Sequence, residues 1–227
     1  MATMIQNRSR VALSVRRSPI IGVVRTSTRE EAAAQARMLA ASGVELVEVT
    51  FTVPGASSLL KELLAARGGD GPPFFGMGTA TTAARAREAA EAGAEFLVTP
   101  NVNAEVAKEA RRAGMFLVMG ALTPTEIVTA HELGADLVKV YPLPPVGGPA
   151  YLQVIRGPLG DVPMLAAGGF GVEDIPAYAR AGASAFGMAA PLLGVGPDEG
   201  EARRRVARAL ALARGQDPAL EAHEENR

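Results

Sequence analysis

The sequence predicts an α/β protein, a (β/α)8 (TIM) barrel with an additional N-terminal helix. Eight short apolar segments alternate with eight helix-patterned segments, which is typical of a parallel sheet covered by helices. The phrase Ala-Gly-Ala or Leu-Gly-Ala recurs at Ala92–Ala94, Leu133–Ala135 and Ala181–Ala183, where glycine ends a helix just before an apolar strand. About 200 residues suit eight compact units. An open doubly wound sheet is the alternative, although no Gly-x-Gly-x-x-Gly follows the first strand.

The eight strands are predicted where runs of apolar residues lie between turn signals. In chain order they are Ile20–Arg25, Glu45–Thr50, Pro73–Met77, Glu95–Thr99, Met115–Met119, Ala135–Pro142, Val162–Ala166 and Ala183–Met188.

The helices are predicted where Ala- and Leu-rich segments lie between a capping residue and a glycine. Thr28 and Glu31 have the spacing of a capping box at the first of them. The predicted helices are 28–42, 55–64, 82–93, 103–114, 124–133, 151–156, 172–181 and 199–214.

A single domain is expected over residues 1–227, with a barrel core at about 18–194 and a polar tail at 215–227. An amphipathic helix from Arg8 to Arg17 is expected to cover one end of the barrel. The first 29 residues contain no acidic residue, which faintly resembles a transit peptide, but the helix is the favoured interpretation and a cytoplasmic location is expected.

Composition excludes several kinds of chemistry. The formal net charge is -1, so no nucleic-acid partner is indicated, and no apolar run reaches the roughly 20 residues that span a bilayer. There are no cysteines, and His131 and His223 lie far apart, so neither a thiolate nor a zinc site is expected. We therefore expect chemistry without a metal or another cofactor.

Lys139 is the residue that points most clearly to a function. Only three of the 23 basic residues are lysines, and Lys61 and Lys108 lie in polar helical segments, whereas Lys139 lies between valines. Burying an ammonium costs several kcal/mol unless the group is paired or loses its proton. Lysine, unlike arginine, can become a neutral nucleophile. Glu48 lies in the equally apolar Val47-Glu48-Val49. The second and sixth strands lie opposite each other in an eight-stranded barrel, so Glu48 and Lys139 could face each other across the lumen. The two could form a catalytic pair or a purely structural one.

Other polar or flexible residues end the predicted strands, where barrel enzymes carry their active sites. Arg25 ends the first strand and could bind a substrate carboxylate bidentately. Gly168 and Gly169 follow the seventh strand, where a phosphate site or a simple turn is expected.

These residues, taken with their neighbours, resemble the 2-keto-3-deoxy-6-phosphogluconate (KDPG) and 4-hydroxy-2-oxoglutarate (KHG) aldolases, class I enzymes with a (β/α)8 fold. The likeness runs from about Ile20 to Leu193. The phrases that carry it are Val-Val-Arg25, Glu48-Val49-Thr50, Pro54-Gly55-Ala56, Gly76-Met77-Gly78-Thr79, Thr99-Pro100-Asn101, Lys139-Val140-Tyr141-Pro142, which resembles Lys-Phe-Phe-Pro, and Gly168-Gly169.

The resemblance implies that Lys139 forms a Schiff base with a 2-oxo acid and that Glu48 is the acid/base. It implies that Arg25 and Thr79 bind the pyruvate part, and it places Pro100, Tyr141, Gly168 and Gly169 in the substrate site. The family is typically trimeric, so a homotrimer is expected.

The chain departs from the family pattern at four places: Thr52, Ala167, Ala189 and Ala190 lack polar or basic groups that other members carry. These departures put a phosphorylated substrate in doubt. Two alternatives to the aldolase remain open: a sugar-phosphate isomerase or epimerase with Glu48 as base, and a catalytically silent barrel that binds a 2-oxo acid.

Overall fold

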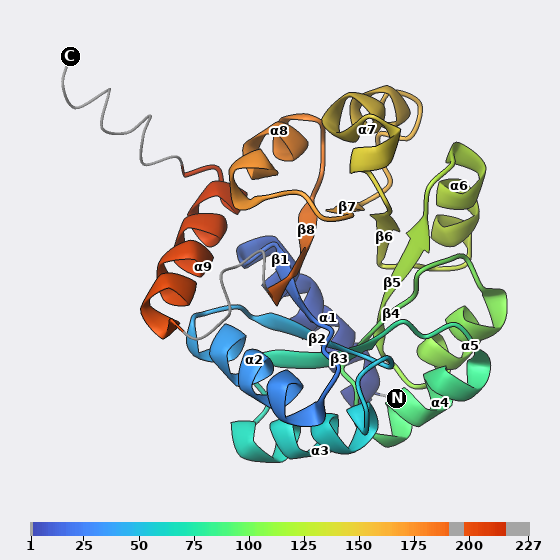
Figure 1. The fold of residues 1–227 in the computed structure, drawn as a ribbon. Coiled ribbons are helices and arrows are strands. Elements are labelled where there is room, and N and C mark those ends of the chain that lie inside the picture. The colour runs from blue at the N-terminus through green and yellow to red at the C-terminus, as the bar shows by residue number, and fades with distance from the viewer. Residues whose placement is uncertain (1, 191–197, 217–227) are drawn as a thin grey trace.

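The computed structural model describes residues 2–190 and 198–216, and they form a closed barrel of eight parallel strands in sequence order (Figure 1). The predicted (β/α)8 barrel is therefore confirmed, and the open doubly wound sheet is wrong. The strands are β1 Ile20–Val24, β2 Leu46–Thr50, β3 Phe74–Gly78, β4 Phe96–Val98, β5 Phe116–Ala121, β6 Leu137–Val140, β7 Met164–Ala167 and β8 Ala185–Ala189.

Helices surround the barrel, as Figure 1 shows looking onto the strands from the end where they finish. They are α1 Ala2–Arg17, α2 Arg29–Ala41, α3 Ala56–Arg67, α4 Ala83–Glu91, α5 Ala104–Arg112, α6 Pro124–Glu132, α7 Gly148–Arg156, α8 Ile175–Arg180 and α9 Glu199–Ala213, with 3-10 turns η1 Pro144–Val146 and η2 Val172–Asp174. No helix among the described residues is long and apolar enough to cross a membrane.

Alternation along the strands produces two separate apolar cores. Residues that point outward pack against the helices, and residues that point inward fill the barrel. The inner core lies near the amino ends of the strands and contains Leu46, Phe74, Phe96, Phe116 and Leu137, all 3% exposed or less. The side chains thus close the lumen at that end and leave the carboxyl ends for a site.

Helix α1 seals the closed end of the barrel, as predicted. Val11 and Val15 belong to the inner core, and the guanidinium of Arg8 pairs with Asp136 at 2.6 Å. In Figure 1 the helix lies behind the strands. It begins at Ala2, so the predicted start at Arg8 was too late, because the segment before it also contains residues that tolerate a helix.

The predicted capping box at Thr28 needs correction. Thr28 caps α2 by accepting from Glu31 N, but the carboxylate of Glu31 accepts from Gln35 Nε2 at 3.3 Å, so the reciprocal bond of a capping box is missing. The capping box forms instead at α6, between Thr123 and Glu126.

The boundaries of later elements also shift. Helix α7 begins at Gly148 rather than at residue 151, and the predicted 172–181 helix is a 3-10 turn followed by α8. Helix α9 lies where the C-terminal helix was predicted. Most of the predicted tail, 217–227, lies outside the described residues, as does 191–197, which includes the predicted end of the core at 194.

Candidate active site

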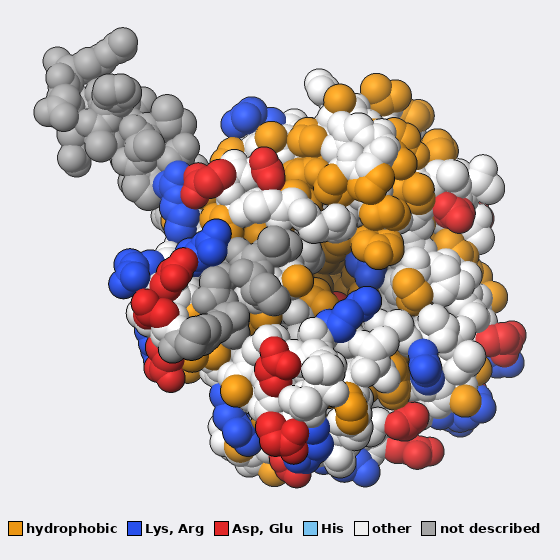
Figure 2. All heavy atoms as spheres, viewed as in Figure 1, with side chains coloured by type: hydrophobic (Ala, Val, Ile, Leu, Met, Phe, Trp, Pro, Cys, Tyr) orange, Lys and Arg blue, Asp and Glu red, His pale blue; other side chains and the backbone are white. Residues whose placement is uncertain are grey.

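A cavity of about 370 Å³ opens at the carboxyl ends of the strands. Figure 2 shows this face hollowed at its centre, with apolar side chains around the hollow and basic atoms within it. A cavity of this size suits a small metabolite. Its lining residues are Ile21, Val23, Arg25, Glu48, Val98, Val118, Lys139, Tyr141, Leu165, Ala167, Gly168, Gly169, Gly187 and Ala189.

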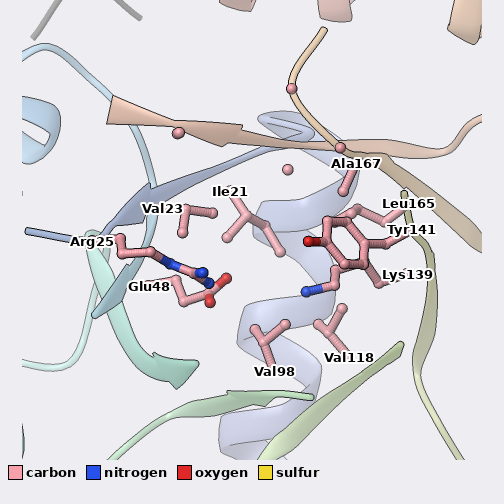
Figure 3. A pocket seen from close by; sticks show the side chains of 14 residues that line it. Ile21, Val23, Arg25, Glu48, Val98, Val118, Lys139, Tyr141, Leu165 and Ala167 are labelled. Atoms are coloured by element: carbon pink, nitrogen blue, oxygen red, sulfur yellow. The ribbon is translucent and has the colours of Figure 1, made fainter. Parts of the chain in front are cut away.

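Glu48 and Lys139 face each other across this cavity. They come from β2 and β6, and Figure 3 shows the amine and the carboxylate pointing toward one another. Within the described part of the chain, no ion pair of 4.0 Å or less joins them. The gap between the two groups is open to the cavity, so reacting atoms of a substrate can lie between them.

Burial changes the proton affinity of both groups. Glu48 is 3% exposed, and desolvation raises the pKa of its carboxyl, against the opposing charges of Lys139 and Arg25. Desolvation lowers the pKa of the Lys139 amine, Arg25 lowers it further, and Glu48 opposes the shift. The sequence could not decide the net direction for the lysine, because burial and the Glu48 charge act against each other. The net lowering favours the neutral, nucleophilic amine.

Glycines on β3 provide the room for these groups. A Cβ at Gly78 would lie 1.7 Å from Glu48 Oε1, and a Cβ at Gly76 would lie 2.5 Å from the ring of Phe96. Side chains at these two positions would therefore collide with the carboxylate and with the floor of the barrel. The sequence phrase Gly76-Met77-Gly78 is thus explained by packing.

Arg25 lies at the rim of the cavity, where Figure 3 shows its side chain directed inward, and its charge acts to lower the pKa of the Glu48 carboxyl. Its Nη2 donates to Thr79 Oγ1 at 3.3 Å. Thr79 has a φ of 63°, a left-handed backbone that is unusual for a β-branched residue. Arg85 Nη1 donates to the carbonyl oxygen of Thr79 at 3.1 Å, which helps to hold that conformation. Two arginines therefore fix Thr79 at the end of β3.

The structure brings most of the predicted site residues together, but not all of them. Arg25, Glu48, Lys139, Tyr141, Gly168 and Gly169 line the cavity. Thr79 is joined to it through Arg25, and Pro100 is not among the lining residues. Its main chain instead lies against Gly120, where a Cβ would be 2.4 Å from the Pro100 carbonyl carbon. A direct substrate contact of Pro100 is thus not supported by its position.

Sequence reasoning missed the apolar wall of the cavity. Val23 lies two residues before Arg25, and Leu165 pairs in register with Lys139, so both point inward with the polar residues. Because side chains alternate along a strand, taking every second residue from the predicted polar ones would have found several of these apolar residues. The remaining missed residues are Ile21, Val98, Val118 and Gly187.

The residues expected at a phosphate site lie at the ends of β7 and β8 or directly after them. Gly168 has a φ of 134° and Gly169 a φ of 93°, and the main chain at residues 142–143 approaches Gly168 so closely that a Cβ would be 2.9 Å from Leu143 N. Ala167 and Ala189 contribute only methyl groups to the cavity. Ala190 is buried, and residues 191–197 lie outside the described residues. Among the described residues, no group of three or more metal-ligating side chains was found.

A half-buried amine that faces a buried carboxylate at the open end of a (β/α)8 barrel defines an enzyme built for chemistry on carbonyl compounds. The chain belongs to the KDPG and KHG aldolase family, whose model matches residues 11–196. The predicted class, a class I pyruvate aldolase and hence a carbon–carbon lyase, is confirmed, and the isomerase or epimerase alternative is not favoured.

Individual relatives are similar over most of their length. The chain is 30% identical over 203 residues to a Rhizobium meliloti protein named "Probable 2-dehydro-3-deoxy-6-phosphogalactonate aldolase", covering 89% of this chain and 94% of that one. It is 30% identical to the Treponema pallidum 2-dehydro-3-deoxy-phosphogluconate aldolase, covering 73% and 77%. The solved KDPG aldolase of Zymomonas mobilis with 3-phosphoglycerate has a TM-score of 0.79 at 25% identity, covering 91% and 97%.

Proposed function

We propose that the protein cleaves a 2-oxo-4-hydroxy acid reversibly to pyruvate and an aldehyde, with Lys139 as the Schiff-base nucleophile and Glu48 as the acid/base. The observation that carries the proposal is the placement of the Lys139 amine, whose pKa burial lowers, opposite the Glu48 carboxylate in one cavity. A structural ion pair would hold the two groups in direct contact instead.

The reaction begins when the neutral Lys139 amine attacks the C2 ketone of the substrate. Loss of water from the carbinolamine gives a protonated imine, which is an electron sink. Glu48 then removes the proton of the C4 hydroxyl, directly or through one water. The C3–C4 bond breaks, its electron pair enters the imine to form an enamine, and the aldehyde leaves.

Glu48 returns a proton to C3 of the enamine, and hydrolysis of the resulting imine releases pyruvate and the free lysine. The raised pKa of Glu48 suits a group that both takes and gives a proton. The scheme draws on no metal, so a chelator such as EDTA is expected to leave the rate unchanged.

Arg25 would bind the carboxylate of the 2-oxo acid. Its guanidinium lies at the rim of the cavity and is held by Thr79, so a planar donor pair is oriented before the substrate arrives. When the substrate carboxylate is bound at Arg25, the C2 ketone of the substrate faces the Lys139 amine. Thr79 acts through Arg25 and is in this sense a positioning residue.

Pyruvate release from a panel of substrates tests the proposal. The panel contains 2-dehydro-3-deoxy-6-phosphogluconate, its galactonate epimer, their unphosphorylated forms and 4-hydroxy-2-oxoglutarate. We expect turnover of at least one of them, and Lys139→Met is expected to lower kcat by about 10³-fold or more. A protein that is stabilised by pyruvate but turns over none of the panel would instead be the silent binding barrel.

We infer that the chain forms a homotrimer and acts in the cytoplasm as one domain. Large apolar side chains are exposed on α6, η1 and α7, including Val128, Val146 and Val154, the last of them 76% exposed. Figure 2 shows this apolar surface beside the cavity. Burying it against another copy would stabilise an assembly. Light scattering that gives the mass of one chain would contradict the trimer.

A further inference from the structure

The side chain of Tyr141 lies at the mouth of the cavity. It comes two residues after Lys139, on the same side of the chain, and Lys139 Nζ lies 5.1 Å from its ring centroid. Figure 3 shows the phenol directed into the cavity. The residue is 41% exposed, whereas Lys139 below it is only partly accessible.

Tyr141 has Ala167 as its neighbour across the wall of the cavity. Lys139 and Leu165 pair in register on β6 and β7, and Leu143 N donates to Ala167 O at 3.0 Å. Tyr141 and Ala167 are therefore adjacent, one layer nearer the mouth than Lys139. On β8, Gly187 pairs in register with Ala167, and Ala189 lies two residues further on and adds only a methyl group to the lining.

The phenol is the one neutral hydroxyl group among the lining residues that the structure describes. The other polar side chains of the lining are Arg25, Glu48 and Lys139, and the proposed reaction already uses all three: Arg25 and Lys139 at the pyruvate half and Glu48 at the C4 hydroxyl and C3. The Tyr141 hydroxyl makes no hydrogen bond to any residue of 2–190 or 198–216. A phenol usually has a partner, so this one is available to a ligand.

We propose that the Tyr141 hydroxyl hydrogen-bonds a hydroxyl group of the aldehyde half and so makes the enzyme select hydroxylated aldehydes. With the carboxylate at Arg25 and C2 at Lys139, the open layer of Tyr141 and Ala167 can receive the rest of the substrate. The resembled Lys-Phe-Phe-Pro phrase has phenylalanine at this position, so Tyr141 adds a hydroxyl group to that phrase. The inference rests on the proposed aldolase reaction and deepens it.

The aldol direction provides the test, because pyruvate can be offered to two acceptors of equal chain length. Glyceraldehyde carries two hydroxyl groups on its three carbons, and propanal carries none. We expect Tyr141→Phe to lower the ratio of kcat/KM for glyceraldehyde to that for propanal by about tenfold, the effect of one lost hydrogen bond. The KM for pyruvate and the borohydride-trapped pyruvate adduct should not change.

Tyr151→Phe is the matched control. The hydroxyl of Tyr151 donates to Leu122 O at 2.9 Å, away from the cavity, so its loss should leave the acceptor ratio unchanged. An unchanged ratio in Tyr141→Phe, or an equal loss for both acceptors, would overturn the inference. Wild-type protein that forms no pyruvate adduct would instead refute the proposed function, so the two failures are distinguishable.

Discussion

The carboxylate of Glu48 occupies the space that a side chain at residue 78 would need. A Cβ added to Gly78 would lie 1.7 Å from Glu48 Oε1 and 2.4 Å from Glu48 Cδ. Thr50 on β2 pairs in register with Gly78 on β3, and Glu48 pairs with Gly76, so the carboxylate leans over the neighbouring strand. The position of the proposed acid/base is therefore set by the absence of a side chain.

Gly78→Ala should displace that carboxylate. We expect kcat to fall by about 100-fold, because a shift of about 1 Å in a catalytic group costs a factor of this size. Trapping of pyruvate on Lys139 should continue, since the amine is untouched. Steady-state kinetics and borohydride trapping of the same preparation separate the two effects.

Two further glycines serve as controls for Gly78→Ala. No atom lies within 4 Å of a Cβ at Gly71, so Gly71→Ala should be silent. Gly76→Ala would push into the Phe96 ring and should lower the free energy of unfolding by about 1–3 kcal/mol. Unchanged kcat in Gly78→Ala would show that the position of Glu48 does not limit the reaction.

Imine formation should follow the titration of Lys139. Only the neutral amine attacks the ketone, so the trapping rate rises with pH, with a midpoint below 10.5 because burial lowers the Lys139 pKa. The charge of Glu48 raises that pKa, so Glu48→Gln should move the midpoint to lower pH. The rate of borohydride inactivation with pyruvate, measured across the neutral and alkaline range, gives the midpoint. An upward shift would contradict this electrostatic coupling.

Thr79 is expected to lower the stability of the fold while it supports the binding of pyruvate. Its left-handed backbone costs about 1–3 kcal/mol, and Thr79→Gly would relieve that cost while making the unfolded chain more flexible. We expect a net gain of about 1 kcal/mol in the free energy of unfolding. Loss of the hydroxyl that accepts from Arg25 should raise the KM for pyruvate several-fold.

Thr79→Ser distinguishes these two effects because it keeps the hydroxyl. It should retain the wild-type KM for pyruvate. If Thr79→Gly proves less stable than the wild type and binds pyruvate normally, both roles assigned to Thr79 are wrong. Denaturant unfolding and pyruvate kinetics are the measurements.

Arg67 and Glu95 stabilise the opposite end of the barrel. Arg67 Nη1 lies 2.8 and 2.7 Å from the two oxygens of Glu95, both side chains are 12% exposed or less, and Phe75 N also donates to Glu95. Arg67→Met should lower the free energy of unfolding by about 3 kcal/mol, because it leaves a buried charge without its partner. Adding Glu95→Gln should restore part of the loss. A change below about 1 kcal/mol would contradict the account.

The barrel could be predicted because its signals are local. Each helix stop at glycine and each apolar run can be read within about ten residues, and these signals repeat around the barrel. Glu48 and Lys139 could be predicted because each is a charged residue in an apolar strand. Their geometry then follows from strand order and alternation, which the closed barrel confirms.

The remaining details depend on contacts between distant segments. The left-handed backbone of Thr79 depends on Arg85 and Arg25, and neither contact has a local sequence signal. The clearance between Gly78 and Glu48 depends on how two strands pair. At Thr28 the carboxylate of Glu31 accepts from Gln35, one helical turn further on, and not from the N-cap main chain.

Reduction of the protein with sodium borohydride in the presence of pyruvate tests the central claim most directly. Peptide mass mapping should find one reduced pyruvyl group per chain, on Lys139, and none without pyruvate or in Lys139→Met. Lys61 and Lys108 are the only other lysines, and both are exposed, so the site can be assigned without ambiguity. The absence of an adduct, or an adduct on either of the other lysines with Lys139 unmodified, would contradict the account.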